Sequence, residues 1–247
     1  MATKSSETST RTIAAIAHLA DDLMLEAERP ILFWLNRHAN RVVLHPGVLT
    51  PGIVILDETL AGLADQRLRI TAFDQTGMVH PSLSNRSLRT FLSPHPGISH
   101  AAEVMLNHLS TRDALPLGLD ILHVSEGVYP THPDDPAIGA LLATHTYLEN
   151  PPRVNLSTAP QWFLLAIAGD ETTSDMINDA LAARAKSHRP ALPAETTAAS
   201  EWIPTLTSTC WSFRVDVQIG PVCRSRWLVF YVNAGQWMCA QRLNISP

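Results

Sequence analysis

Apolar residues near the N-terminus recur every three or four positions, which is the spacing of one face of an α-helix. The acidic residues in this stretch lie largely off that face, so the pattern predicts an amphipathic helix. Two interpretations stay open: the apolar face packs on the chain's own domain, or it packs on helices of a partner protein. The face consists of Ile13, Ile16, Ala20, Leu23 and Ala27.

Pro30 interrupts the helical pattern, and it either kinks this helix or starts a second one, because proline is tolerated in a first turn. Two runs that favour strands follow, at residues 52–57 and 66–73. In the second run apolar and polar residues alternate, which is typical of a half-buried strand. Residues 74–77, Asp-Gln-Thr-Gly, supply the turn chemistry that ends it.

The C-terminal part of the chain shows the clearest alternation, between residues 211 and 219. Gly220-Pro221 and Asn233-Ala234-Gly235 are turn sequences, and strands are predicted at 226–232 and 236–245. The three strands form an antiparallel meander if each pairs with the next.

Between about Pro81 and Trp202 the alternation disappears, and short helical stretches are separated by proline and glycine. The order of elements predicts an α+β fold, in which an N-terminal helix packs on an antiparallel sheet that carries a large inserted helical domain. The predicted domains are 11–79 with 205–247, which form one split α/β domain, and 80–204, which forms the insertion. The candidate helices of the insertion are 85–92, 99–109, 117–124, 136–142, 160–168 and 173–187.

Composition narrows the class of protein. The 247 residues are 45% hydrophobic, enough for a buried core, and the net charge of -5 gives no general attraction to nucleic acid or anionic lipid. The longest uninterrupted apolar run is the seven residues 162–168, against roughly 20 for a membrane-spanning helix. The polar N-terminus lacks the apolar middle of a signal peptide.

Cysteine and histidine patterns give no sign of a metal site or an active site. The three cysteines, Cys210, Cys223 and Cys239, are an odd number and contain no CxxC pair, so neither a disulfide framework nor a zinc site is predicted. Because the predicted meander places Cys210 and Cys239 two strands apart, we expect them to stay unpaired. The eleven histidines form no HExxH motif, and GxSxG and Walker patterns do not occur. No enzymatic activity, catalytic residue or cofactor-binding residue is predicted.

Residues 160–187 resemble a helix-hairpin-helix, in which backbone amides of the hairpin meet a nucleic-acid phosphate. The hairpin here is Ala168-Gly169-Asp170-Glu171. Two carboxylates would face the phosphate, whereas binding depends on Lys and Arg. A DNA-binding protein is therefore the alternative hypothesis, and nucleic acid is not an expected partner.

A more specific resemblance lies in Asn155-Leu156-Ser157-Thr158-Ala159-Pro160 and the apolar stretch that follows it. This segment resembles the signature of the K-type minor pseudopilins of bacterial type II secretion systems (general secretion pathway protein K). Residues 119–127, 143–146 and 74–79 are similar to further segments of that family. Motifs support the resemblance over roughly residues 69–204. The residues on either side resemble the family only in the order of their predicted helices and strands.

The resemblance implies a non-enzymatic structural protein at the tip of the pseudopilus, which takes part in protein export by assembling with other minor pseudopilins. Its partners would be the I-type and J-type minor pseudopilins, with secreted substrates as further candidates. The N-terminal helix would carry the partner contacts. The family implies a periplasmic location and, in a full-length form, anchoring in the inner membrane through an N-terminal segment that this chain lacks.

Calcium is a candidate ligand only by this resemblance, since some family members bind it through an acidic stretch. In this chain the matching residues 106–113 keep a single acid. Asp134-Asp135 is an acidic pair between prolines, too few carboxylates for the six to eight oxygen ligands of Ca²⁺. No metal or cofactor is therefore predicted.

Overall fold

The structure, a computed structural model, describes residues 2–48, 52–59, 66–78, 152–169, 171–192 and 202–245. The chain divides into two compact units. The first consists of Met1–His38, Ile53–Ala72 and Ser212–Pro247, and the second of Ala39–Gly52 and Phe73–Trp211.

The first unit begins with two consecutive helices, α1 (Ala2–Glu26) and α2 (Glu28–His38). Pro30 lies in the first turn of α2, so the pattern around it marks the start of a second helix. The helical phase continues through the junction, because the Ala27 amide donates to the Leu23 carbonyl at 3.1 Å and the Ile31 amide to the Ala27 carbonyl at 3.3 Å.

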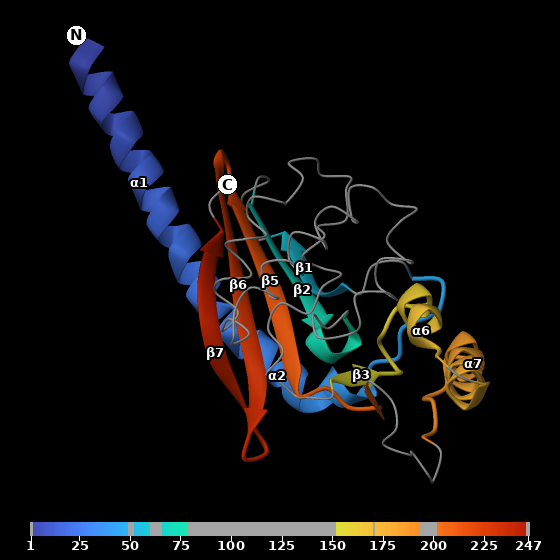
Figure 1. The fold of residues 1–247 in the computed structure, drawn as a ribbon. Helices are drawn as coiled ribbons and strands as arrows, with labels where there is room; N and C mark the ends of the chain where they lie inside the picture. Colours follow the sequence, from blue (N-terminus) through green and yellow to red (C-terminus); the bar gives the residue numbers. More distant parts are fainter. Residues whose placement is uncertain are drawn as a thin grey trace, which may run out of the picture. The chain divides into compact units, whose positions relative to one another are not determined.

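One face of these helices is buried in the first unit. Helix α1 contacts strand β6 (Val222–Asn233), and α2 contacts strand β7 (Gln236–Ile245). The N-terminal part of α1 projects beyond the strands (Figure 1). The buried stripe, as we call this face, consists of Ala20, Met24, Ala27, Ile31 and Leu35.

The sheet has five strands in the order β1-β2-β5-β6-β7. Its other strands are β1 (Ile53–Thr59), β2 (Gln66–Asp74) and β5 (Cys210–Ile219). The pairs β1/β2 and β6/β7 are antiparallel. Strand β6 lies between β5 and β7, which confirms the strand order predicted for the C-terminal meander.

Alternation on β5 supplies much of the core of the first unit. Phe213, Val215, Val217 and Ile219 are buried, as their period-two spacing predicted. The Phe213 ring packs edge-to-face against Trp34 of α2 at a centroid distance of 5.9 Å, and against Phe230 of β6 at 5.6 Å. These aromatic contacts link the helix to two neighbouring strands.

The second unit contains the 3-10 turn η2 (Gln75–Gly77), helices α6 (Gln161–Ile167) and α7 (Glu171–Ala185), and two short strands. Strands β3 (Arg153–Asn155) and β4 (Ile203–Thr205) form a parallel two-stranded sheet. Sequence patterns did not predict this pair, because three residues are too few to show an alternation.

The predicted combination of an N-terminal helix with a mixed helical and antiparallel fold is confirmed. The predicted helices 160–168 and 173–187 correspond to α6 and α7. The boundaries 80–204 of the inserted domain stay a prediction. The remaining expectations lie outside the described residues: the helices 85–92, 99–109, 117–124 and 136–142, the resembling segments 119–127 and 143–146, the region 106–113 and the pair Asp134-Asp135.

Candidate functional site

The N-terminal helix carries the residues that the sequence singled out for partner contacts, and the structure separates them into two groups. Ala20 and Ala27 are 0% and 1% exposed and belong to the buried stripe. Ile13 is 49% exposed, while Ile16 and Leu23 are half-buried. Only these last three therefore have side chains that a partner could reach.

Four of the accessible apolar residues of α1 form a continuous surface. Leu19, which was not among the residues predicted to contact a partner, is 45% exposed and follows Ile16 by three positions, so the two are neighbours on the helix. We call the surface formed by Ile13, Ile16, Leu19 and Leu23 the apolar ridge.

Among the described residues, no helix is both long enough and apolar enough to cross a membrane.

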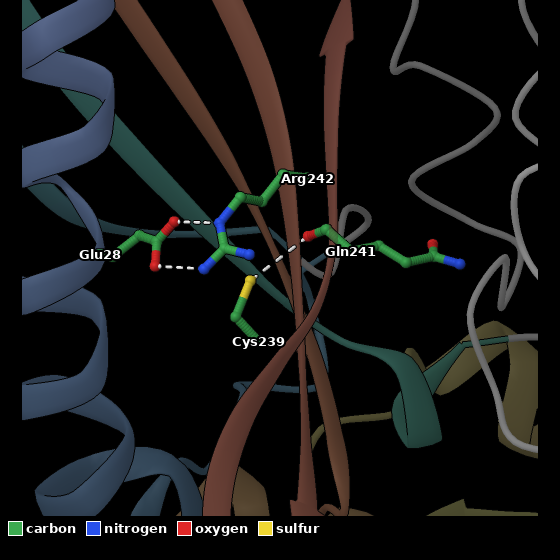
Figure 2. Close-up of polar contacts among 4 residues, drawn as sticks. All are labelled: Glu28, Cys239, Gln241 and Arg242. Carbon is green, nitrogen blue, oxygen red and sulfur yellow. Dashed lines mark hydrogen bonds and ion pairs between the residues drawn. The ribbon is translucent and has the colours of Figure 1, made fainter.

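An ion pair joins the helices to the last strand in the first unit (Figure 2). Arg242 of β7 donates from Nε and Nη2 to the two carboxylate oxygens of Glu28, at 2.5 and 2.9 Å. The Cys239 thiol lies beside this pair and donates to the Gln241 carbonyl at 3.4 Å (Figure 2). Burial raises the pKa of Cys239, so this thiol is a weak nucleophile.

The second unit contains a buried carboxylate, that of Asp74, which is 1% exposed. A buried carboxylate is tolerated when hydrogen-bond donors replace its lost hydration. Five donors from four residues surround this one, and we call Asp74 with these residues the Asp74 cluster. Oδ1 accepts from the backbone amide and hydroxyl of Thr76 and from the Ser208 hydroxyl, and Oδ2 accepts from the Asn155 amide at 2.7 Å and the Thr158 hydroxyl at 2.6 Å.

The Asp74 cluster holds two turns in close contact. Gly77 faces Thr158 so closely that a Cβ atom at position 77 would lie 2.5 Å from the Thr158 hydroxyl oxygen. It would also lie 3.1 Å from the Thr158 backbone carbon and 3.2 Å from the Ala159 backbone nitrogen. Only glycine fits this approach without moving the backbone of the facing turn.

A buried cation holds the same turn through its carbonyl groups. Arg184 of α7 is 1% exposed and donates from Nη1 to the carbonyls of Leu156, at 3.2 Å, and Ala159, at 2.6 Å. Its Nε donates to the carbonyl of Leu44 at 2.6 Å. Burial lowers the pKa of Arg184 to about 10, so the guanidinium stays protonated at neutral pH.

The turn at residues 155–159 is thus held by a buried anion, which accepts from its side chains, and a buried cation, which donates to its carbonyls. This arrangement fixes a backbone conformation. Among the described residues, no group of three or more His, Cys, Asp and Glu side chains could hold a metal ion. The sequence signalled the turn through its resemblance segment, but it gave no sign that Arg184 and Ser208 would join it.

The helix-hairpin-helix-like segment is described except for residue 170. Helix α6 ends at Ile167, and α7 begins at Glu171, two residues before the predicted start at residue 173. Of the basic residues near the end of α7, Arg184 is buried and its guanidinium is hydrogen-bonded to carbonyls, so it cannot neutralise a phosphate. Lys186 and Arg189 are exposed, and Arg189 donates to the Leu206 carbonyl at 2.9 Å.

No protein-family model matches the chain, and no curated protein matches it. Among solved structures, it is similar to a chain in the crystal structure of the GspK-GspI-GspJ complex from the type 2 secretion system of enterotoxigenic Escherichia coli. The identity is 13%, the TM-score is 0.46, and 99% of each chain is covered.

Proposed function

We propose that this chain is a K-type minor pseudopilin, a non-enzymatic subunit at the tip of a type II secretion pseudopilus. One observation carries the proposal. Two segments that resemble the family in sequence, residues 74–79 and 155–160, meet in the Asp74 cluster, where Asn155 and Thr158 donate to the carboxylate of Asp74. The resembling residues therefore support one another structurally.

The first unit supports the same function. Its N-terminal helix packs on a sheet with antiparallel pairs, and α1 bears the apolar ridge. Such a ridge fits helix-on-helix packing with partner subunits. We propose the I-type and J-type minor pseudopilins as partners and the periplasm as the location, with inner-membrane anchoring in a full-length form. Secreted substrates are further candidate partners.

The test is co-expression with the I-type and J-type minor pseudopilins of the same genome, followed by affinity capture and size-exclusion chromatography. We expect a stable complex. The double variant Ile13→Asp with Ile16→Asp should weaken capture by roughly tenfold or more, because it places charges on the apolar ridge. Leu25→Asp is the matched control, since Leu25 is also exposed, at 56%, on α1 but lies outside the ridge.

Circular dichroism on each variant separates loss of binding from loss of fold. Met24→Asp serves as the reference for unfolding, because Met24 is 2% exposed within the buried stripe. If the wild-type chain forms no complex, the proposed function is wrong. If Leu25→Asp weakens capture as much as the ridge variant does, the proposed binding surface is wrong.

DNA binding is the alternative outcome, and it is tested on the same preparation. The affinity of a helix-hairpin-helix protein for DNA falls steeply as salt rises. The reason is that binding to duplex DNA releases roughly 0.9 condensed counterion for each phosphate that the protein neutralises. We expect no such curve in a titration with labelled duplex DNA, because Arg184 is buried and residue 170 of the hairpin is acidic. Micromolar binding with a slope of several units would overturn the secretion proposal.

A further inference from the structure

The five-stranded sheet has two edges, and charged residues are distributed unequally between them. Strand β1 forms one edge and carries the exposed acids Asp57 and Glu58 among its seven residues. Strand β7 forms the other edge, and Arg242 is the single charged residue among its ten. Charged side chains on an edge strand oppose the pairing of a further strand. The β7 edge has less of this protection than the β1 edge.

The one charge of β7 is held over a face of the sheet by a helix. The Arg242 guanidinium donates through two nitrogens to the carboxylate of Glu28 in α2, and α2 contacts β7 (Figure 2). Because both partners of this pair are fixed by two hydrogen bonds, the guanidinium is kept beside the helix. It is therefore not available to repel a strand that approaches the free side of β7.

A β-bulge separates Arg242 from the beginning of β7. Cys239 and Gln241 pair with successive residues of β6, so Ala240 between them has no partner on that strand. Residues 236–239, which lie between the turn and this bulge, contain no charged residue and no proline. We call residues 236–239 the open edge.

Backbone groups of the open edge alternate in direction. Strands β6 and β7 are joined by Ala234-Gly235, whose φ angles of 49° and 79° are those of a two-residue type I′ turn. The pair that flanks such a turn, Asn233 with Gln236, is hydrogen-bonded, and non-bonded and bonded pairs then alternate along the strands. Trp237 and Cys239 fall in non-bonded pairs, so their N–H and C=O groups point away from β6. Within the described sheet no strand lies on that side, because β7 ends the strand order.

Outward N–H and C=O groups on an edge strand can bind an extended chain as an additional strand. The side chains of the open edge favour an uncharged chain, since Met238 is 46% exposed and Trp237 is half-buried. Apolar residues on neighbouring strands stabilise one another across a sheet. We propose that the open edge binds an extended, uncharged segment of another protein, which adds as a strand beside β7 and places an apolar side chain next to Met238.

A second copy of this chain fits the open edge less well. Symmetric antiparallel pairing of two β7 strands would place the two N-termini at opposite ends, which conflicts with the N-terminal anchoring proposed above. The open edge is about 14 Å long at 3.4 Å per residue, so the contact is small and binding should be weak. Only the argument against a second copy depends on the proposed function, because the apolar ridge is not part of the open edge.

The test is NMR on the isotope-labelled full chain, at a concentration where sedimentation shows a monomer, with the capped peptide Ser-Thr-Val-Thr-Val-Thr-Ser as the probe. Without peptide, the amides of Trp237 and Cys239 should exchange with water faster than that of Met238, which donates to β6. At saturating peptide, we expect the exchange of the Trp237 and Cys239 amides to slow by roughly tenfold or more.

Two controls separate strand addition from other binding. A fully N-methylated peptide of the same sequence keeps the side chains but lacks N–H donors, and it should not bind. Met238→Lys should weaken binding of the unmodified peptide by roughly tenfold or more, because it places a charge on the open edge. Val54→Lys is the matched variant, since Val54 is also 46% exposed but lies on β1, and it should leave binding unchanged.

Circular dichroism verifies that both lysine variants keep their fold, and the methylated peptide tests the wild-type chain even if Met238→Lys does not. Unchanged exchange at Trp237 and Cys239, equal binding of the methylated peptide, or an equal loss in Val54→Lys would overturn the proposal. So would a dimer at higher protein concentration that Met238→Lys abolishes, since a second copy would then occupy the open edge.

Discussion

The carboxylate of Asp74 accepts a hydrogen bond of 2.7 Å from the side-chain amide of Asn155, a residue 81 positions later in the chain. The same carboxylate binds Ser208, which is a further 53 positions away (208 − 155). One buried charge therefore connects three segments of the second unit that the sequence separates widely. The hydrogen bonds to this carboxylate help to fix where the turn at residues 155–159 lies.

Asp74→Asn should destabilise the protein by about 3 kcal/mol. The substitution keeps the volume of the side chain, but it replaces one acceptor oxygen with an NH₂ group that faces donors. Urea unfolding followed by circular dichroism measures the change. Ser157→Ala is the matched control: Ser157 is also 1% exposed and lies in the facing turn, and its hydroxyl oxygen has no hydrogen-bond partner in the described structure. An equally large loss in that control would mean that burial alone explains the effect.

Gly77→Ala should destabilise the protein by about 1–3 kcal/mol, because the added methyl group cannot fit against Thr158 and the backbone of Ala159. Gly169→Ala provides the comparison, since a Cβ atom there would meet no atom within 4 Å. That variant should be close to neutral in the same unfolding measurement. If the two alanine variants unfold at the same urea concentration, the close approach of the two turns is not present in solution.

The three thiols should react in an order set by their surroundings. Burial and the nearby charge of Asp74 raise the pKa of Cys210, so little thiolate forms there in the folded protein. Cys223 is exposed and should be alkylated first at pH 8, followed by Cys239, as peptide mass spectrometry can determine. If Cys210 in the folded protein were alkylated before the other two thiols, it could not be buried as described. A disulfide between Cys210 and Cys239 would contradict the strand order.

The raised pKa of Cys210 also predicts how the free energy of unfolding changes with pH. Its ordinary pKa is 9.0, so above this pH the unfolded chain releases the proton while the folded chain keeps it. The contribution of Cys210 to the free energy of unfolding therefore decreases as the pH rises above about 9. Cys210→Ala should remove this part of the pH dependence, which a comparison of urea midpoints at pH 8 and pH 10 would detect.

Sequence patterns predicted the first unit well, because its elements are long and bury one face. The alternation at residues 211–219 identified β5, and the apolar spacing near the N-terminus identified α1. The helical spacing placed Ile13 and Ala20 on one face, but it could not show where along the helix the sheet ends. Ile13 is consequently exposed and Ala20 buried, although both fit the same periodicity.

The Asp74 cluster was only partly predictable. The resemblance segments indicated that residues 74–79 and 155–160 belong to a specific structure, but no local pattern pairs a carboxylate with donors far along the chain. Arg184 shows the same limit, since a basic residue in the last turn of a helix is usually exposed and favourable to the helix dipole. Here it is buried because the backbone carbonyls of Leu44, Leu156 and Ala159 accept hydrogen bonds from its guanidinium.

The buried stripe of the N-terminal helices has a consequence for how the chain is made. Helix α1 contacts β6, and Glu28 of α2 binds Arg242, which is synthesised 214 residues later. At roughly 5–20 residues per second, this delay lasts about 10 to 40 s. During that time the apolar face of the helices leaves the ribosome before the strands that will cover it exist. The first unit can therefore complete its folding only once β7 has been synthesised, and a nascent chain that stalls before β6 presents this face to chaperones.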